Sequence, residues 1–361
     1  MTTKTTKFLA ILFACASLTR TVLGWGAEGH MVVAQLAYNH LDAAVKTKCD
    51  ALIAVNLGTF SSNGTSNFVT AACWADDFKT QLGTGINHFI DLPFSLDGTS
   101  TNGVPSPPAT NDVVRAINQC ITTLQDPTQS VTNQAFALRY LIHFVGDIQQ
   151  PLHCSDAVYH SQTNGDLGGN NFVITGTWNN LHSLWDNGGG FVGSSITRPF
   201  TAASYAIITS TVASVEAAYP YPATVGSIPD PMTWALEGWW LAQTNSYVGV
   251  SSNAAPSAAY LNTAQATSEQ RMAVGGQRLA KLLGTIYVTN APPLISATIT
   301  NNNFNLSWGA VTGRIYRVQW KQQPTDVVWS NLADVTVSNT SASFIDTLAQ
   351  PQRFYRLIVV N

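Results

Sequence analysis

The chain has 361 residues, which is enough to bury a large core and to fold as more than one domain. Only 10% of the residues are charged, and the formal net charge is −3. This composition lacks the basic surface of a duplex-DNA-binding protein. Low charge combined with many Asn, Thr, Ser and Gly residues favours a secreted protein over a cytosolic one.

The first 24 residues have the layout of a secretory signal peptide. Two lysines precede an apolar run from Phe8 to Leu18, and the small residues Val22 and Gly24 occupy the −3 and −1 positions of a cleavage site. The run is too short to span a membrane, and no later segment is long and apolar enough. Cleavage after Gly24 would make Trp25 the first residue of a secreted protein with 14 basic and 20 acidic side chains, a net charge of −6. An uncleaved N-terminal anchor is the alternative interpretation.

Residues 25–290 are predicted to form a mainly α domain. Apolar residues recur with helical periodicity in five segments, and loops rich in Gly, Asn and Ser separate them. The five segments are 31–54, 111–125, 133–148, 231–247 and 269–287. A short hairpin is expected at 170–180.

The character of the sequence changes at "VTNAPPL", residues 288–294. Beyond it the chain has short segments rich in β-branched and aromatic residues. In residues 315–321, Tyr316 and Val318 alternate with polar residues, as expected of a half-buried strand. Residues 291–361 are therefore predicted to form a small β-sandwich of fibronectin or immunoglobulin type, with five to seven strands. Nothing in this domain looks catalytic, and its ligand is unknown.

Four cysteines would remain after cleavage, namely Cys49, Cys73, Cys120 and Cys154. In an oxidising compartment they could form two disulfides, in any of three connectivities. They lack the close pairing of a thiolate zinc site. We therefore predict a structural role for them.

The histidines and aspartates form a pattern that favours a metal centre. A catalytic zinc site needs neutral imidazoles and carboxylates that converge from several elements. Two pairs, His143 with Asp147 and His182 with Asp186, are four residues apart, which places each pair on one helix face. One such pair is compatible with an ordinary helix-surface contact. Further candidates make that explanation insufficient: Asp76, His88 with Asp91 three residues on, His153 after the helix-ending Pro151, and His30 five residues after Trp25. His40 and His160 have no carboxylate at helical spacing and are not candidates.

Six segments together resemble the S1/P1 family of zinc-dependent, single-strand-specific nucleases. They are "WGAEGH", "CWADDFK", "HFIDLP", "RYLIHFVGDIQQPLH", "DLGGNNF" and "NLHSLWDN", in the family's order and spacing. The resemblance covers about residues 25–288. It implies the mainly α fold shared by these nucleases and bacterial phospholipases C, followed here by the β-sandwich.

The resemblance also implies a trinuclear zinc site. Its ligands would be Asp76, His88, His143 and Asp147 for the first ion, His153, His182 and Asp186 for the second, and the amine and carbonyl of Trp25 with His30 and the bridging Asp147 for the third. The choice of Asp76 over Asp77 rests on the family's Trp-Ala-Asp order. Three Zn²⁺ and three carboxylates would leave the site with a charge of about +3, which would replace the missing basic surface.

The activity implied by the resemblance is hydrolysis of single-stranded DNA and RNA to 5′-phosphonucleotides, with 3′-nucleotidase activity and no duplex-specific binding. A hydroxide held between zinc ions would attack phosphorus. Asp91 would orient the attacking water, and Lys79, if it is not simply a surface lysine, would add positive charge. Phe89 is the candidate for base stacking, with plain core packing as the alternative. Gly188 stands where many relatives have a polar residue, so Asn187 is the candidate for base recognition.

Two other functions remain open. A zinc phospholipase C on the same scaffold is the first, although that branch favours a glutamate where this chain has Asp186. A non-catalytic secreted binding protein with structural zinc is the second. Every ligand position is filled, which favours the enzyme.

Overall fold

The computed structural model describes residues 25–104, 111–221 and 230–288, and in the C-terminal part residues 294–300, 303–310, 313–323, 326, 328–339, 341–347 and 353–360. The predicted signal peptide, residues 1–24, lies outside the described residues, and so does the predicted domain boundary at 290/291.

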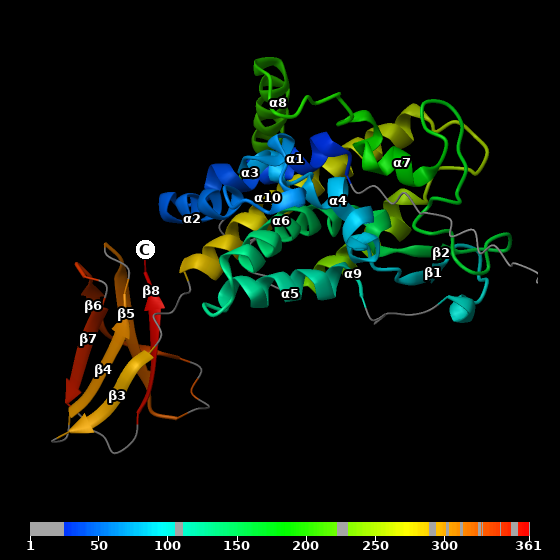
Figure 1. Ribbon diagram of the computed structural model, residues 1–361. Helices are drawn as coiled ribbons and strands as arrows, with labels where there is room; N and C mark the ends of the chain where they lie inside the picture. Colours follow the sequence, from blue (N-terminus) through cyan, green and yellow to red (C-terminus); the bar gives the residue numbers. More distant parts are fainter. Residues whose placement is uncertain are drawn as a thin grey trace, which may run out of the picture.

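Residues 25–288 form the helical part of the molecule (Figure 1). Its α-helices are α1 (Ala27–His40), α2 (Ala43–Ile53), α3 (Phe68–Ala71), α4 (Trp74–Leu82), α5 (Val113–Gln125), α6 (Val131–Asp147), α7 (Leu181–Asp186), α8 (Ala202–Ala218), α9 (Pro231–Leu241) and α10 (Ala258–Val288). Short helical turns include η3 (Gly85–His88), η5 (Pro151–Cys154) and η6 (Gly188–Gly190). The strands β1 (Pro93–Ser95) and β2 (Asp156–Val158) form a small parallel pair.

The helix boundaries follow local signals in the sequence. The segment 31–54 was expected to share one helical face, but Leu41 adopts extended backbone and divides it into α1 and α2. Ser130 caps α6, because its side chain accepts the amide hydrogen of Asn133. The helix ends at Asp147, before Pro151, as the conformational restriction imposed by proline requires.

Some elements were missed or reduced relative to the prediction. Helix α8 was not predicted, because its long run of Ala, Ile, Val and Thr shows no clear alternation of polar and apolar positions. The three-residue strands β1 and β2 were also missed. The hairpin expected at 170–180 is a single antiparallel bridge between Val173 and Asn180.

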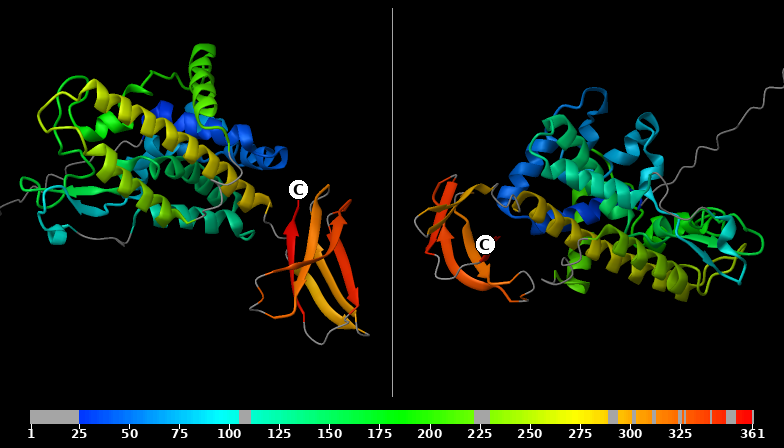
Figure 2. Two further views of the ribbon diagram at one scale, coloured as in Figure 1. Left: turned by 180° about the vertical axis from the view of Figure 1, so that it is seen from behind. Right: turned by 90° about the horizontal axis from the view of Figure 1, so that it is seen from below.

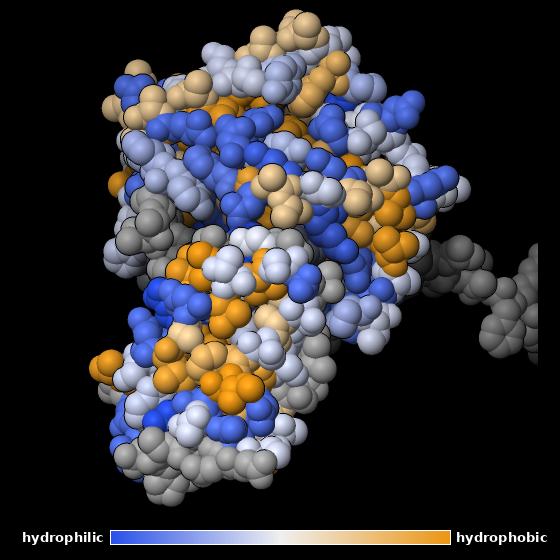
Figure 3. Space-filling view, turned by 90° about the vertical axis from the view of Figure 1, so that its left-hand side faces the viewer, coloured by the Kyte–Doolittle hydropathy of each residue, from blue (hydrophilic) through white to orange (hydrophobic). Residues whose placement is uncertain are grey.

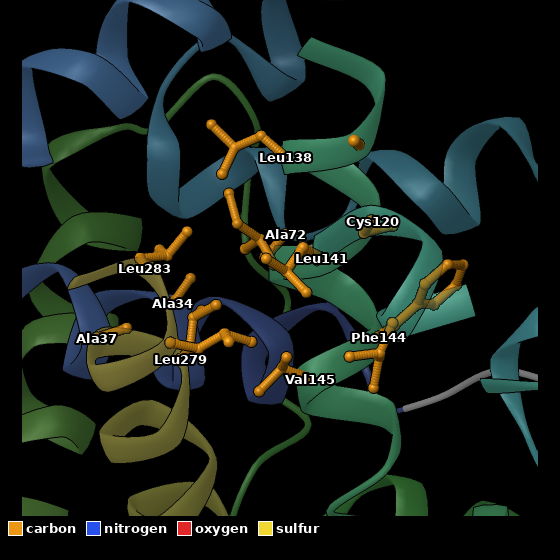
Figure 4. Close-up of a cluster of buried hydrophobic side chains, with 14 of the residues drawn as sticks. Ala34, Ala37, Ala72, Cys120, Leu138, Leu141, Phe144, Val145, Leu279 and Leu283 are labelled. Atoms are coloured by element: carbon orange, nitrogen blue, oxygen red, sulfur yellow. The ribbon is translucent and has the colours of Figure 1, made fainter. Parts of the chain in front are cut away.

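The core of the helical part lies between α1, α6 and α10 (Figures 2 and 4). Figure 4 shows Ala34 and Ala37 of α1 facing Leu279 and Leu283 of α10, with α6 beside them. Because the alanine side chains are small, α1 and α10 can pack close together. Gly276 of α10 serves the same purpose, because an added Cβ there would collide with α1. Helix α6, which carries the candidate ligands His143 and Asp147, is therefore embedded in this core.

The C-terminal part consists of two three-stranded antiparallel sheets, with strand orders β3-β4-β7 and β6-β5-β8. The strands are β3 (Leu294–Thr300), β4 (Asn303–Gly309), β5 (Ile315–Lys321), β6 (Ser330–Thr336), β7 (Ser341–Thr347) and β8 (Phe354–Val359). Trp308, Tyr316 and Val318 are fully buried between the sheets. A mainly helical part followed by a small all-β part confirms the predicted fold class.

Apolar surface remains on this C-terminal part. Ile299, Val328 and Ile345 are more than half exposed, and Figure 3 shows apolar residues gathered on the β-rich part as seen from that side. Among the described residues, no helix combines the length and apolarity needed to cross a membrane.

The predicted disulfides are not formed. Cys49, Cys73, Cys120 and Cys154 are all buried free thiols. They lie on or beside separate elements, each packed among apolar neighbours, and the thiol of Cys154 donates to the carbonyl of Ile148 at 3.4 Å. Burial raises the pKa of all four thiols to about 12. They act as small apolar groups in the core.

Candidate metal centre

Eight predicted ligand side chains converge from four α-helices and two short helical turns of the helical part. They are His30 of α1, Asp76 of α4, His88 of η3, His143 and Asp147 of α6, His153 of η5, and His182 and Asp186 of α7. All except Asp76 are buried, and the side chain of Asp76 is 19% exposed. Charged and titratable side chains are rarely buried unless they are paired, so a largely buried cluster of eight indicates a site with a function.

Asp147 lies at the centre of the cluster. Its Oδ2 is 2.9 Å from Nδ1 of His88 and 3.1 Å from Nε2 of His143. Its Oδ1 is 3.3 Å from Nε2 of His30 and 3.6 Å from Nδ1 of His153. One fully buried carboxylate therefore contacts four imidazoles, which come from four different elements.

The first group of candidate ligands surrounds His143. Ligand atoms of His88, His143 and Asp147 lie within 4.8 Å of one another, and so do those of His30, Asp76 and His143. Oδ1 of Asp76 is 3.8 Å from Nδ1 of His88 and 3.8 Å from Nε2 of His143. The rings of His30 and His143 stack with centroids 3.9 Å apart. His30 therefore lies beside two members of the first group, His143 and Asp147.

The second group consists of His153, His182 and Asp186, whose ligand atoms also lie within 4.8 Å of one another. Nε2 of His153 is 3.7 Å from Oδ1 of Asp186, and Nε2 of His182 is 3.5 Å from Oδ2. The spacing of four residues brings His182 and Asp186 together on α7, as predicted from the sequence.

Backbone carbonyls set the orientation of three imidazole rings. Nδ1 of each ring contacts a carbonyl oxygen at 2.6 to 2.8 Å. The pairs are His143 with Ala72, His153 with His88, and His182 with Gly168. Because a carbonyl oxygen can only accept, Nδ1 carries a hydrogen, and in the neutral form of each ring the lone pair lies on Nε2. This is the arrangement that orients and tunes histidine ligands in metal sites.

Electrostatic interactions divide the imidazoles into two classes. Burial lowers the pKa of His143 and of His153, but the charges and hydrogen bonds of the neighbouring carboxylates outweigh it and raise both values to about 9. Burial lowers the pKa of His30 and His88. Burial alone would raise the pKa of Asp147, but His143 and His88 hold it well below its ordinary value.

Several buried polar atoms of the cluster have no hydrogen-bond partner. They are both ring nitrogens of His30, Nε2 of His88 and Oδ1 of Asp147. Buried nitrogen and oxygen atoms are nearly always satisfied, so unsatisfied ones concentrated in a single cluster point to an absent partner. Imidazole nitrogens and carboxylate oxygens, with no thiolate among them, form a donor set that zinc accepts. The residues present therefore fit the predicted metal.

Trp25 lies between the two groups of ligands. Its indole N–H donates to the carbonyl of Gly146 at 2.9 Å, next to Asp147. The amide of Gly26 donates to the carbonyl of Asp186 at 2.9 Å. The predicted mature N-terminus is thus anchored between the ends of α6 and α7.

The remaining predicted site residues lie in three places. Nζ of Lys79 donates to Oδ1 of Asp76 at 3.0 Å, so this lysine adjoins the cluster. Phe89 and Asp91 are half-buried on either side of Ile90, whose amide donates to the carbonyl of His153 at 2.8 Å. Among the described residues, Phe89 belongs to none of the apolar clusters, which leaves it available for stacking.

Asn187 is engaged in holding the end of α7. Its side-chain amide donates to the carbonyl of Ser183 at 2.8 Å. Gly188 and Gly189 follow with φ values of 55° and 62°, and a Cβ at Gly189 would lie 2.9 Å from the Cβ of Ala264. The backbone thus accounts for glycine where a polar residue was expected. A role for Asn187 in base recognition stays a prediction.

Two residues that support the second group were not singled out from the sequence. Nε2 of the buried Gln150 donates to Oδ1 of Asp186 at 2.8 Å. Asp166 accepts the amide of Gly169 at 2.9 Å and the hydroxyl of Tyr247 at 2.7 Å. Asp166 thereby fixes the loop whose carbonyl orients His182. The motifs "QQPLH" and "DLGGNNF" contain these residues, but no spacing to a partner reveals their role.

The histidines excluded from the sequence lie outside the cluster. His40 contacts Glu216 at 3.1 Å on the surface and stacks on Tyr221. His160 is exposed.

The helical part of the chain is similar to known nucleases. A family model described as S1/P1 Nuclease matches residues 25–288. Nuclease P1 of Penicillium citrinum is 31% identical over 179 residues, which cover 45% of this chain. The chain spans only 57% of the length of that relative. Nuclease S1 of Aspergillus oryzae is 28% identical over 306 residues, covering 78% of this chain and 98% of that protein.

Among solved structures, an alpha-toxin of Clostridium perfringens matches with a TM-score of 0.38 and 10% identity, covering 91% of this chain and 85% of the toxin chain.

Proposed function

Because the chain belongs to the S1/P1 nuclease family, we propose that it is a secreted, zinc-dependent phosphodiesterase that hydrolyses single-stranded DNA and RNA to 5′-phosphonucleotides. The observation that carries the proposal is the cluster around Asp147, where one buried carboxylate contacts four imidazoles and where ring nitrogens of His30 and His88 have no hydrogen-bond partner.

The site would hold three zinc ions with the ligands that the resemblance implies. Asp76, His88, His143 and Asp147 would form the first site. His153, His182 and Asp186 would form the second. Trp25, through its free amine and carbonyl, would form the third with His30 and Asp147. Bound zinc supplies a Lewis acid that stabilises charge on phosphoryl oxygens and lowers the pKa of water from 15.7 to about 7.

The protein side chains around this centre would position the substrate. Lys79, which donates to Asp76 at 3.0 Å, would offer its amine to a phosphate oxygen. Asp91 would accept a hydrogen bond from the attacking water and orient it. Phe89 would stack on a base of a splayed strand, an interaction worth ~1–3 kcal/mol. Asn187 would contact the base edge. A paired duplex cannot present a base in this way, and a 3′-nucleotide can, so 3′-nucleotidase activity would accompany the nuclease.

Processing and domain organisation form part of the proposal. Residues 1–24 would be a signal peptide cleaved after Gly24, residues 25–290 the nuclease domain and residues 291–361 an accessory sandwich. Cleavage at this position is supported by the full burial of Trp25, by its bond to the carbonyl of Gly146 in α6, and by the bond of Gly26 to the carbonyl of Asp186 in α7.

The test is hydrolysis of a single-stranded oligonucleotide by the processed, full-length protein, with a chelator and zinc add-back. Release of 5′-mononucleotides that stops with chelator and returns with zinc is expected. A fully metal-loaded protein that leaves the oligonucleotide intact would overturn the proposal, and phosphatidylcholine would be the next substrate to try.

Two adjacent carboxylates of α4 provide a matched control. Asp76 faces the cluster. Asp77 instead forms an ion pair with Arg198, with 2.6 Å between Oδ2 of Asp77 and Nη1 of Arg198. Asp76→Asn should reduce the rate by roughly 100-fold or more, since even indirect disturbance of a metal ligand reduces affinity or activity 10–100-fold. Asp77→Asn should leave the rate nearly unchanged. Equal effects of the two substitutions would contradict the assignment of Asp76 as a ligand.

A further inference from the structure

The two parts of the chain carry opposite charge. Residues 25–290 contain nine basic and seventeen acidic side chains, a net charge of −8. Residues 291–361 contain five basic and three acidic side chains, a net charge of +2. Away from the metal centre, the helical part therefore repels a polyanionic strand, and the C-terminal part attracts one.

The sheet β6-β5-β8 has one face that is not used for the core of the sandwich (Figure 1). On β5, Tyr316 and Val318 point into the core. The intervening residues of a strand point the other way, so Gln319 and Lys321 lie on the outer face. Arg356 of β8 pairs with Gln319 across the strands and shares that face.

A cation–aromatic cluster occupies this outer face. Nζ of Lys321 lies 4.7 Å from the ring centroid of Trp329, and Cζ of Arg356 lies 4.5 Å from it. We call Lys321, Trp329 and Arg356 the Trp329 cluster. Nε of Arg356 donates to Oε1 of Gln319 at 2.8 Å, and Gln319 in turn donates to Asn331 at 2.6 Å. The guanidinium group is thus held in place before any ligand binds.

The state of Arg356 differs from that of other arginines of the sandwich. Arg317 is paired with Asp334 at 2.7 Å, and Arg353 is paired with Asp346 at 2.6 Å. None of the ion pairs of the described residues includes Arg356, and its side chain is exposed. Its charge is available to an anionic ligand.

We propose that the Trp329 cluster binds single-stranded nucleic acid and holds the substrate of the metal centre near the enzyme. Lys321 and Arg356 would pair with phosphates, and a base would stack on the surface that Trp329 and the guanidinium plane of Arg356 form. Aromatic rings combined with cationic side chains are a common design of single-strand-binding surfaces. The identity of the ligand rests on the proposed function, which supplies the need for a single strand.

Tethering predicts that the benefit depends on substrate length. A strand bound at the sandwich would raise the effective concentration of its remaining nucleotides at the metal centre. A dinucleotide cannot occupy both places. The cluster should therefore lower KM for long strands and leave kcat, and both constants for a dinucleotide, unchanged.

The test uses the full-length protein, with an oligonucleotide of about 30 residues as probe. Fluorescence anisotropy in the presence of a chelator measures binding without cleavage. Trp329→Ala and Arg356→Gln should each raise the Kd, with loss of the Trp329 stack predicted to weaken binding by between about 5-fold and 150-fold. Trp329→Phe keeps a ring and should retain most of the binding. Arg356→Gln should also reduce the salt dependence, with the slope of log K against log salt lower by about 0.7.

Arg317→Gln is the matched control, because this arginine lies on β5, the strand next to that of Arg356, but is neutralised by Asp334. It should leave the Kd unchanged. Wild-type affinity in both cluster variants would overturn the proposal, as would binding of a sulfated polysaccharide in place of the oligonucleotide. Because binding is measured with chelator, its loss or retention is read independently of nuclease activity. Failure of cleavage alone would overturn only the proposed function.

Discussion

Replacement of Asp147 by asparagine tests the organisation of the centre. The substitution keeps the shape of the side chain and removes one negative charge from a site where both oxygens contact imidazoles, at 2.9 to 3.6 Å. A unit charge pair about 4 Å apart interacts by about 4 kcal/mol at an effective dielectric constant of 20. That free energy corresponds to roughly a 1000-fold loss of affinity for a cation, because each 1.36 kcal/mol is a factor of ten.

The effect should extend to more than one metal. Oδ2 of Asp147 faces His88 and His143, whereas Oδ1 faces His30 and His153. Asp147→Asn should therefore empty more than one metal position at micromolar free zinc and abolish cleavage.

His182→Ala is the comparison, because His182 belongs to a single group of ligands. The assay is the metal-to-protein ratio by mass spectrometry after dialysis, with cleavage measured on the same samples. His182→Ala should lose about one zinc ion per protein, fewer than Asp147→Asn. The reasoning is refuted if Asp147→Asn retains the wild-type zinc content. It is also refuted if His182→Ala loses as much zinc as Asp147→Asn.

Three further predictions follow from the site. Asp166→Ala would leave the hydroxyl of Tyr247 and two buried amides without an acceptor, at about 1–3 kcal/mol each; thermal unfolding should show a marked loss of stability, and an unchanged melting temperature would contradict the role of this loop. A single residue added before Trp25 should reduce zinc content and activity, whereas an equally active extended protein, checked by N-terminal sequencing, would show that no free amine is required. His143 and His153 have a pKa of about 9 in the metal-free protein, so zinc binding at about pH 7.5 should release about two protons, and the release should decrease as the pH rises through 9. Calorimetry in buffers of different ionisation enthalpy measures it, and a pH-independent release would be inconsistent with these pKa values.

The sequence revealed the candidate ligand side chains, but not the backbone carbonyls and side-chain amides that hold them in place. His143 with Asp147 and His182 with Asp186 could be singled out from their spacing together with the other histidines and aspartates, because charged and titratable side chains are seldom buried without a partner. The carbonyls that orient the rings could not, because every residue has a carbonyl and only the fold decides which one points at Nδ1. Gln150 was missed for a similar reason, since a buried amide has no distinctive spacing to its partner.

The fold shows the same division. The mainly α domain with a β-rich tail could be predicted from periodicity, but the end of α1 at His40 could not, because the apolar pattern continues across Leu41. The unpaired state of the four cysteines depends on where the packed elements place them, and a linear sequence does not show that. The ligand assignments and the domain boundaries stay predictions.

We propose that the eight converging side chains and the N-terminal Trp25 form one metal centre that hydrolyses phosphodiesters. The decisive experiment is titration of the metal-free, processed protein with zinc, with cleavage of a single-stranded oligonucleotide followed at each step. We expect no cleavage by the metal-free protein and an activity that appears only as the last of the bound ions is taken up. Full cleavage by the metal-free protein, or full zinc loading without any cleavage, would contradict it.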